Sequence, residues 1–136
     1  PVEGIQIWLA LPTDIEDCEP SFAHYPAEVI PSVNLPTMSA QVLIGSAFGV
    51  ESPVKTASAT TYLDLALGAG TRYVPDFPHQ ELAIYVAWGN VTVNGEEVPE
   101  FHLAVLDENA EIEMNAAAIS FLIISLLFFR KNIVIK

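Results

Sequence analysis

Alternation of apolar and polar residues with a period of two is the feature that most constrains the fold of this chain. Leu82, Ile84 and Val86 alternate with smaller or more polar residues, and the same pattern recurs over residues 5–9, 62–67 and 91–93. Successive side chains of a β-strand point to opposite faces, so a period of two predicts strands with one buried face. The chain is therefore expected to fold from several half-buried strands.

Turn residues divide these strands at short intervals. Asn94-Gly95 follows the run over 91–93, and both residues tolerate the positive φ of a two-residue hairpin. Further strands are predicted over 40–46, 103–106, 112–114 and 118–124, which indicates an all-β sandwich or barrel. One short helix is expected at residues 13–16, where Thr13 and Glu16 match a capping box, and Pro20 ends it.

The two ends of the chain carry unusual composition. Residues 19–38 contain four prolines, which predicts an extended arm with apolar anchors. Residues 116–129 are almost wholly apolar and precede Arg130 and Lys131, as in a membrane anchor with a basic flank. Fourteen helical residues would span only about 21 Å of a hydrocarbon core that is about 30 Å thick. A buried last strand is therefore expected, and no membrane association.

Charge restricts the possible partners. The chain of 136 residues has the length of one domain, and its formal net charge is −12. Three of its five basic residues lie in the last seven positions, so residues 1–129 contain only Lys55 and Arg72 against seventeen acidic residues, a net charge of −15. Such a body repels phosphate backbones, which argues against direct nucleic-acid binding. The acidity indicates solubility or, alternatively, a basic partner or cation.

Cysteine content and the first residues indicate the cellular context. Cys18 is the single cysteine, so an internal disulfide is not expected, and a reducing cytoplasm is the predicted location. The sequence starts at Pro1 without the pattern of a signal peptide, which suggests a segment of a longer protein.

Several segments, in order, resemble the C-terminal domain of the pirin family, whose members contain two cupin barrels in one chain. The most specific match is Gly-Ile-Gln-Ile-Trp-Leu-Ala-Leu-Pro at residues 4–12. Further matches lie at residues 22–25, 28–31, 42–49, 52–56, 62–65 and 69–70. The resemblance implies a cupin-type jelly-roll barrel over roughly residues 3–124. We expect one domain over 1–136, with the crossing arm and first strand at 1–38 and an atypical tail at 125–136.

Metal binding is the chemistry that a cupin fold brings into question. Cupin sites use two histidines one residue apart on a strand, together with a glutamate and a later histidine. The three histidines here, His24, His79 and His102, lie far apart. The nearest approach to the motif is His79-Gln80-Glu81, but Glu81 is expected on the face opposite Leu82.

His79, Glu81 and His102 are therefore weak metal candidates. For His79 we favour an exposed loop position, and for His102 a hydrogen bond at a strand edge. No catalytic or cofactor-binding residue is predicted. Trp8, Tyr85 and Trp88 are expected at core or interface positions rather than in a pocket.

The resemblance implies a function as well as a fold. It implies a non-catalytic partner domain that packs on a metal-binding N-terminal cupin, where a divalent metal such as iron would belong. Pirins are linked to quercetin 2,3-dioxygenase activity and to transcriptional co-regulation through protein partners. Two alternatives stay open, namely a stand-alone metal-dependent dioxygenase that uses His79 and Glu81, and a homodimer in which a second copy replaces the missing cupin.

Overall fold

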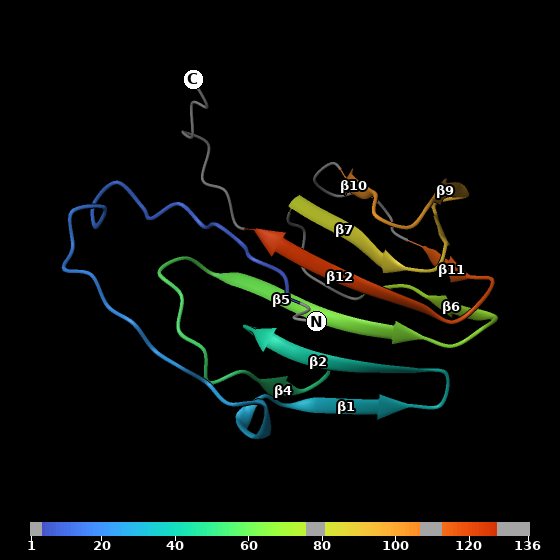
Figure 1. Cartoon of the computed structure of the whole chain (residues 1–136), viewed down its shortest axis with the longest axis horizontal. Coiled ribbons are helices and arrows are strands. Elements are labelled where there is room, and N and C mark those ends of the chain that lie inside the picture. Colours follow the sequence, from blue (N-terminus) through green and yellow to red (C-terminus); the bar gives the residue numbers. More distant parts are fainter. Residues whose placement is uncertain (1–3, 76–80, 107–112, 128–136) are drawn as a thin grey trace.

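The computed structural model describes residues 4–75, 81–106 and 113–127, with side chains up to residue 123 of the last segment. Its largest element is an antiparallel sheet of six strands in the order β1-β2-β5-β12-β7-β10 (Figure 1). The strands are β1 (Ser32–Leu35), β2 (Met38–Ile44), β5 (Thr60–Leu67), β12 (Ser120–Leu127), β7 (Glu81–Trp88) and β10 (Leu103–Leu106).

A second antiparallel sheet has four strands in the order β6-β11-β8-β9. These strands are β6 (Thr71–Tyr73), β11 (Met114–Ala116), β8 (Val91–Val93) and β9 (Glu96–Val98). A small hairpin, formed by β3 (Ser46–Ala47) and β4 (Val50–Glu51), lies between β2 and β5 in the sequence. The predicted all-β, cupin-type jelly roll is confirmed.

One hydrophobic core joins the two sheets. The alternation seen in the sequence places every second side chain of β5, namely Leu63, Leu65 and Leu67, at zero exposure. Full burial of such a side chain stabilises the fold by roughly 1.5–3 kcal/mol. The core also contains aliphatic or methionine side chains from both sheets: Met38, Ala40, Val42, Leu82, Ile84, Val86, Val91, Val93, Val98, Met114, Ala116 and Leu122.

The predicted hairpin at Asn94-Gly95 is confirmed. Val91 to Val93 pair with Glu96 to Val98, and both turn residues have positive φ, 52° for Asn94 and 84° for Gly95. The Asn94 side chain also accepts a hydrogen bond from the backbone N–H of Glu113 at 2.8 Å. The turn therefore anchors Glu113, the residue just before β11.

The N-terminal arm, residues 4–31, differs from the expectation in two places. The predicted strand over 5–9 is wrong, because these residues pair with no strand among those described, and Trp8 is 87% exposed. The predicted helix at 13–16 is also wrong, since the chain forms two successive turns there, closed by Ile15 N–H to Pro12 and Cys18 N–H to Ile15. The one described helix is the 3₁₀ turn η1 (Ala27–Val29).

The last described strand, β12, lies between β5 and β7 near the middle of the large sheet (Figure 1). The predicted last strand is therefore present, but only its inner face is buried, since Leu122 has zero exposure and Phe121 is 44% exposed. The strand continues to Leu127, past residue 125 where the family resemblance stops. The strand expected at 112–114 overlaps β11 at Met114, since Glu113 lies just before the strand and residue 112 lies outside the described part. No helix in the described ranges is long and apolar enough to cross a bilayer.

Candidate functional site

The interior of the sandwich is the place where a cupin would hold a metal, and here its lining is aliphatic. The inward positions of β5 and β7 carry Leu63, Leu65, Leu82, Ile84 and Val86, none of which can ligate a cation. No group of three histidine, cysteine, aspartate or glutamate side chains comes together among the described residues. The described interior does not fit a cupin metal site.

The three weak metal candidates are not gathered into one site. Glu81 begins β7 as an exposed residue, on the side opposite the buried Leu82. His102 is also exposed and lies beside Val86, whose N–H donates to the His102 carbonyl at 3.0 Å. Five strand positions separate Glu81 from Val86, about 17 Å at ~3.4 Å per residue, so Glu81 and His102 cannot share an ion. His79 lies outside the described residues.

A strand-edge hydrogen bond accounts for His102. Its ring Nδ1 lies 3.0 Å from the carbonyl oxygen of Glu100, and its backbone N–H donates to Pro99 at 3.1 Å. These contacts fix the turn that leads into β10. The geometry supports a structural interpretation of this histidine.

The outer face of the large sheet is apolar and exposed over β12, β7 and β10. Leu103 lies opposite Tyr85, and Tyr85 lies opposite Ile123, so the three side chains form one row on the same side. Val105 and Leu103 are 71% and 59% exposed. We call these side chains, with Trp88 and Phe121, the outer apolar patch: Tyr85, Trp88, Leu103, Val105, Phe121 and Ile123.

A β-bulge brings the largest side chain into this patch. The register of β12 against β7 shifts between Phe121 and Leu122, so that Trp88 pairs with Phe121 although Val86 pairs with Leu122. The extra residue reverses the alternation and places Trp88 on the outer side. The two rings lie 6.0 Å apart between centroids with a tilt of 58°, a favourable aromatic geometry. Sequence reasoning missed this because strict alternation assigns Trp88 to the inner face.

The row of the patch continues onto β5, where it meets a carboxylate. Asp64 lies between Gln41 and Ile123 in the same row. Burial raises the pKa of Asp64, because a partly desolvated carboxylate favours its neutral form. Burial also raises the pKa of Tyr62, and the negative charge of Asp64 adds to that rise. Covering this part of the face with a partner is therefore favourable only if the Asp64 carboxyl becomes protonated or pairs with a cation.

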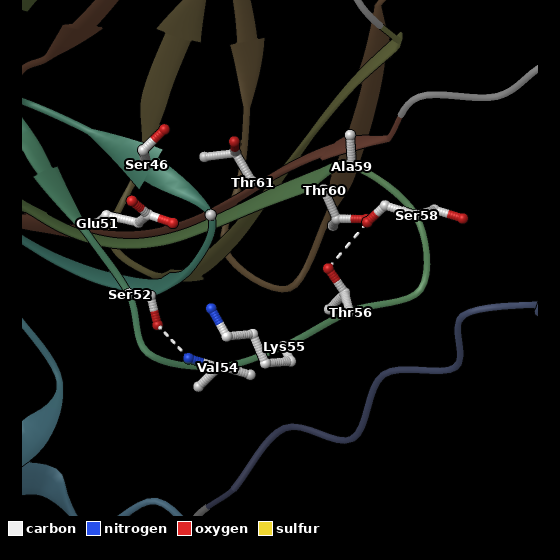
Figure 2. Close-up of a pocket in the computed structure, with 11 residues that line it drawn as sticks. Ser46, Glu51, Ser52, Val54, Lys55, Thr56, Ser58, Ala59, Thr60 and Thr61 are labelled. Carbon is white, nitrogen blue, oxygen red and sulfur yellow. Dashed lines mark hydrogen bonds between the residues drawn. The ribbon is translucent and has the colours of Figure 1, made fainter.

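A polar hollow lies away from the patch, between the β3–β4 hairpin, the loop that follows it and the start of β5 (Figure 2). Lys55 is its cation, and hydroxyl side chains supply much of the rest. Sequence reasoning did not single out this site. The sequence feature that could have indicated this site is Lys55, which is one of two basic residues in the first 129 positions.

Among known proteins the chain is similar to pirins and pirin-like proteins, although no family model matches it. It is 37% identical over 106 residues to a pirin-like protein of Caulobacter vibrioides, covering 76% of this chain and 36% of that protein. It is 28% identical over 119 residues to human pirin, covering 84% of this chain and 41% of pirin. The chain therefore spans well under half the length of these relatives.

Solved structures agree with the fold. A quercetin 2,3-dioxygenase from Acinetobacter baumannii superposes with a TM-score of 0.80 at 28% identity, covering 95% of this chain and 44% of that one. GK1651 of Geobacillus kaustophilus gives a TM-score of 0.79 at 23% identity, covering 91% of this chain and 53% of that one. In both cases this chain corresponds to about half of a larger protein.

Proposed function

Because this chain belongs to the pirin family, we propose that it acts as the C-terminal, non-catalytic cupin of a two-cupin unit. In this proposal the domain packs on a metal-binding cupin and closes one side of its site. A divalent metal such as iron belongs to that partner cupin. The coverage of about two fifths of human pirin is consistent with one domain of such a pair.

The observation that carries the proposal is the outer apolar patch. Leu103, Val105, Trp88 and Phe121 are each between 44% and 71% exposed on one side of a sheet. Contiguous apolar side chains on a sheet face mark an interaction surface. Aromatic residues, here Tyr85, Trp88 and Phe121, are typical of side chains that dominate binding energy.

The N-terminal arm supports the same proposal. Its apolar side chains include Trp8 and Phe22, which are 87% and 93% exposed and are therefore not stabilised by packing against the described barrel. Figure 1 shows the arm as a long loop that swings away from the large sheet before η1. We infer that the arm reaches the partner cupin, where the alternating residues 5–9 would find a strand to pair with.

The aliphatic interior favours a non-catalytic role over a stand-alone dioxygenase. A metal-dependent oxygenase needs imidazole or carboxylate ligands around an open coordination position. The described inward positions of β5 and β7 supply none. No observation on the described residues favours the alternative.

The proposal is tested by binding. The part of the Caulobacter vibrioides pirin-like protein that this chain does not match would be produced separately, checked for folding by circular dichroism, and titrated with this chain by calorimetry. We expect saturable binding with a negative heat-capacity change, the sign of buried apolar area. No binding to a folded partner would overturn the proposal.

A variant pair locates the interface. Val105→Glu places a charge in the outer apolar patch and should abolish binding, since an unpaired buried charge is strongly unfavourable. Glu96→Gln, on the exposed edge strand β9 of the other sheet, is the control and should bind as the unaltered chain does. Equal affinity of both variants would show that the patch is not the binding surface. Self-association lost in Val105→Glu, without binding to the partner, would favour the homodimer instead.

A further inference from the structure

We propose that the hollow around Lys55 binds a small carboxylate that also carries hydroxyl groups. The hollow has a volume of about 310 Å³, at the lower end of the range for small-molecule sites. This site is separate from the outer apolar patch and does not depend on the proposed function. Its walls come from the β3–β4 hairpin, the loop over residues 52–59 and the first two residues of β5.

Lys55 supplies the positive charge. Among the described residues the only other lysine or arginine is Arg72, and that guanidinium is paired with Glu113. Lys55 makes no ion pair within the described part of the chain, although acidic residues outnumber basic ones by more than three to one. Figure 2 shows its ammonium pointing into the hollow, toward the strands that carry Glu51 and Thr60. An unpaired ammonium that points into a hollow is suited to receive an anionic oxygen.

Two hydroxyl groups of the hollow are left as hydrogen-bond acceptors. Thr56 and Thr60 both donate their hydroxyl protons to the carbonyl oxygen of Ser58, at 2.8 and 3.2 Å. A hydroxyl whose proton is used still has lone pairs to accept a hydrogen bond. Glu51, an exposed carboxylate on the same wall, can accept hydrogen bonds as well. These groups match a ligand that donates hydrogen bonds through hydroxyls.

The floor of the hollow is held in place by backbone contacts. Ser52 N–H donates to the carbonyl oxygen of Gly45 at 2.8 Å. The Ser52 side chain donates to Leu43 O at 2.8 Å and accepts from Val54 N–H at 3.2 Å, which fixes the turn just before Lys55. Gly45 lies so near β5 that a Cβ on it would be 2.4 Å from the Thr60 carbonyl oxygen. The site is therefore largely formed before a ligand arrives, which lowers the entropy lost on binding.

Charge selects a carboxylate over phosphate. The chain has a net charge of −12, and Glu51 adds a negative charge within the hollow itself. Both repel a dianion more strongly than a monoanion. One ammonium facing several acceptors therefore suits one carboxylate group surrounded by hydroxyls, as in a sugar acid.

Nuclear magnetic resonance titration of the chain tests this assignment. The ¹⁵N-labelled chain would be titrated with D-glucuronate, with D-glucose, which has a hydroxymethyl group in place of the carboxylate, and with inorganic phosphate. We expect saturable amide shifts at Gly45, Ser52 and Thr60 with glucuronate and at least tenfold weaker effects with the other two. Absence of shifts with glucuronate, or equal shifts with glucose or phosphate, would overturn the proposal.

Two charge variants complete the test. Lys55→Met removes the ammonium and should weaken glucuronate binding about tenfold, because a charged hydrogen bond is lost. Arg72→Gln removes the same charge from β6, outside the hollow, and should leave the affinity unchanged. Because Arg72 also pairs with Glu113, circular dichroism would first show that both variants are folded. Equal affinities of the two variants would overturn the assignment of Lys55 to the ligand.

Discussion

Gly45→Ala offers a direct test of how closely the chain between β2 and β3 approaches β5. Gly45 has a φ of 76°, and an added Cβ would lie 2.4 Å from the Thr60 carbonyl oxygen, where ordinary contacts begin at 3.4 Å. The substitution therefore introduces a backbone penalty and a steric clash together. Gly49→Ala separates them, because Gly49 has a φ of 78° but nothing within 4 Å of its added Cβ.

The two penalties can be estimated from the geometry. A left-handed backbone costs alanine about 1–2 kcal/mol, and the stiffer unfolded chain returns about 0.4–1 kcal/mol, so Gly49→Ala should lose about 1 kcal/mol. Gly45→Ala must also displace Thr60, which belongs to β5 and pairs with β12. Overpacking of this kind costs about 1–3 kcal/mol more. The total loss at Gly45 is then about 2–4 kcal/mol.

Urea denaturation followed by circular dichroism measures the difference. With a slope of about 1–3 kcal/mol per molar urea, the midpoint of Gly45→Ala should fall below that of Gly49→Ala by about 1 M. Unchanged slopes would show that both variants unfold from the same native state. Midpoints equal within error would refute the close approach of Gly45 to Thr60.

Three further predictions concern the core and two carboxyl groups. Leu122→Ala, at zero exposure, should destabilise the fold by about 2–5 kcal/mol, and Val105→Ala, at 71% exposure, by under about 0.5 kcal/mol, as measured by urea denaturation; similar losses would contradict the assigned faces. The folded-state pKa of Asp64 is raised above 3.8, so its ionisation destabilises the fold as pH rises through that raised value. Asp64→Asn should then gain stability relative to the unaltered chain over the same rise, and thermal melts that stay parallel from pH 3 to 7 would contradict this. A hydrogen bond from Arg72, followed by one from Asn115, lowers the pKa of Glu113 from 4.5 to about 2, so its stabilisation is present above pH 4.5 and is lost as pH falls toward 2. Glu113→Gln should be less stable at pH 6 and equal at pH 2, and an equal difference at both values would refute the pairing.

Strands whose local pattern agrees with their tertiary contacts could be predicted from the sequence alone. The alternation at Leu82, Ile84 and Val86 predicts β7, and the Asn94-Gly95 turn predicts the β8–β9 hairpin. In both cases the local preference and the tertiary contacts favour the same structure.

The arm shows where such reasoning fails. Residues 5–9 alternate as a strand does, but a strand also requires a neighbouring strand to pair with, and these residues pair with none of the described strands. The capping box near Thr13 is a local signal for a helix of about two turns, which is too short to persist without packing. Neither failure is visible in the residues themselves.

The candidate sites were hidden for different reasons. The place of Trp88 in the apolar patch depends on the bulge beside Phe121, and one extra residue in a strand pairing cannot be recognised in a single sequence. The hollow forms because the folded chain brings Glu51, Lys55 and Thr60 together around Gly45, and this tertiary arrangement cannot be recognised in the sequence. Alternation places Glu81 on an exposed face, and the position of His102 just before the strand over 103–106 predicts a strand-edge role, so both could be placed from the sequence.

The position of β12 affects the order in which the barrel can assemble during synthesis. Until residues 120–127 leave the ribosome, β5 and β7 each keep one unpaired edge, because β12 is the strand that pairs with both. Synthesis proceeds at about 5–20 residues per second, so these two hydrophobic strands wait for seconds with exposed hydrogen-bonding groups. The nascent domain is thus most prone to wrong strand pairing just before its central strand arrives.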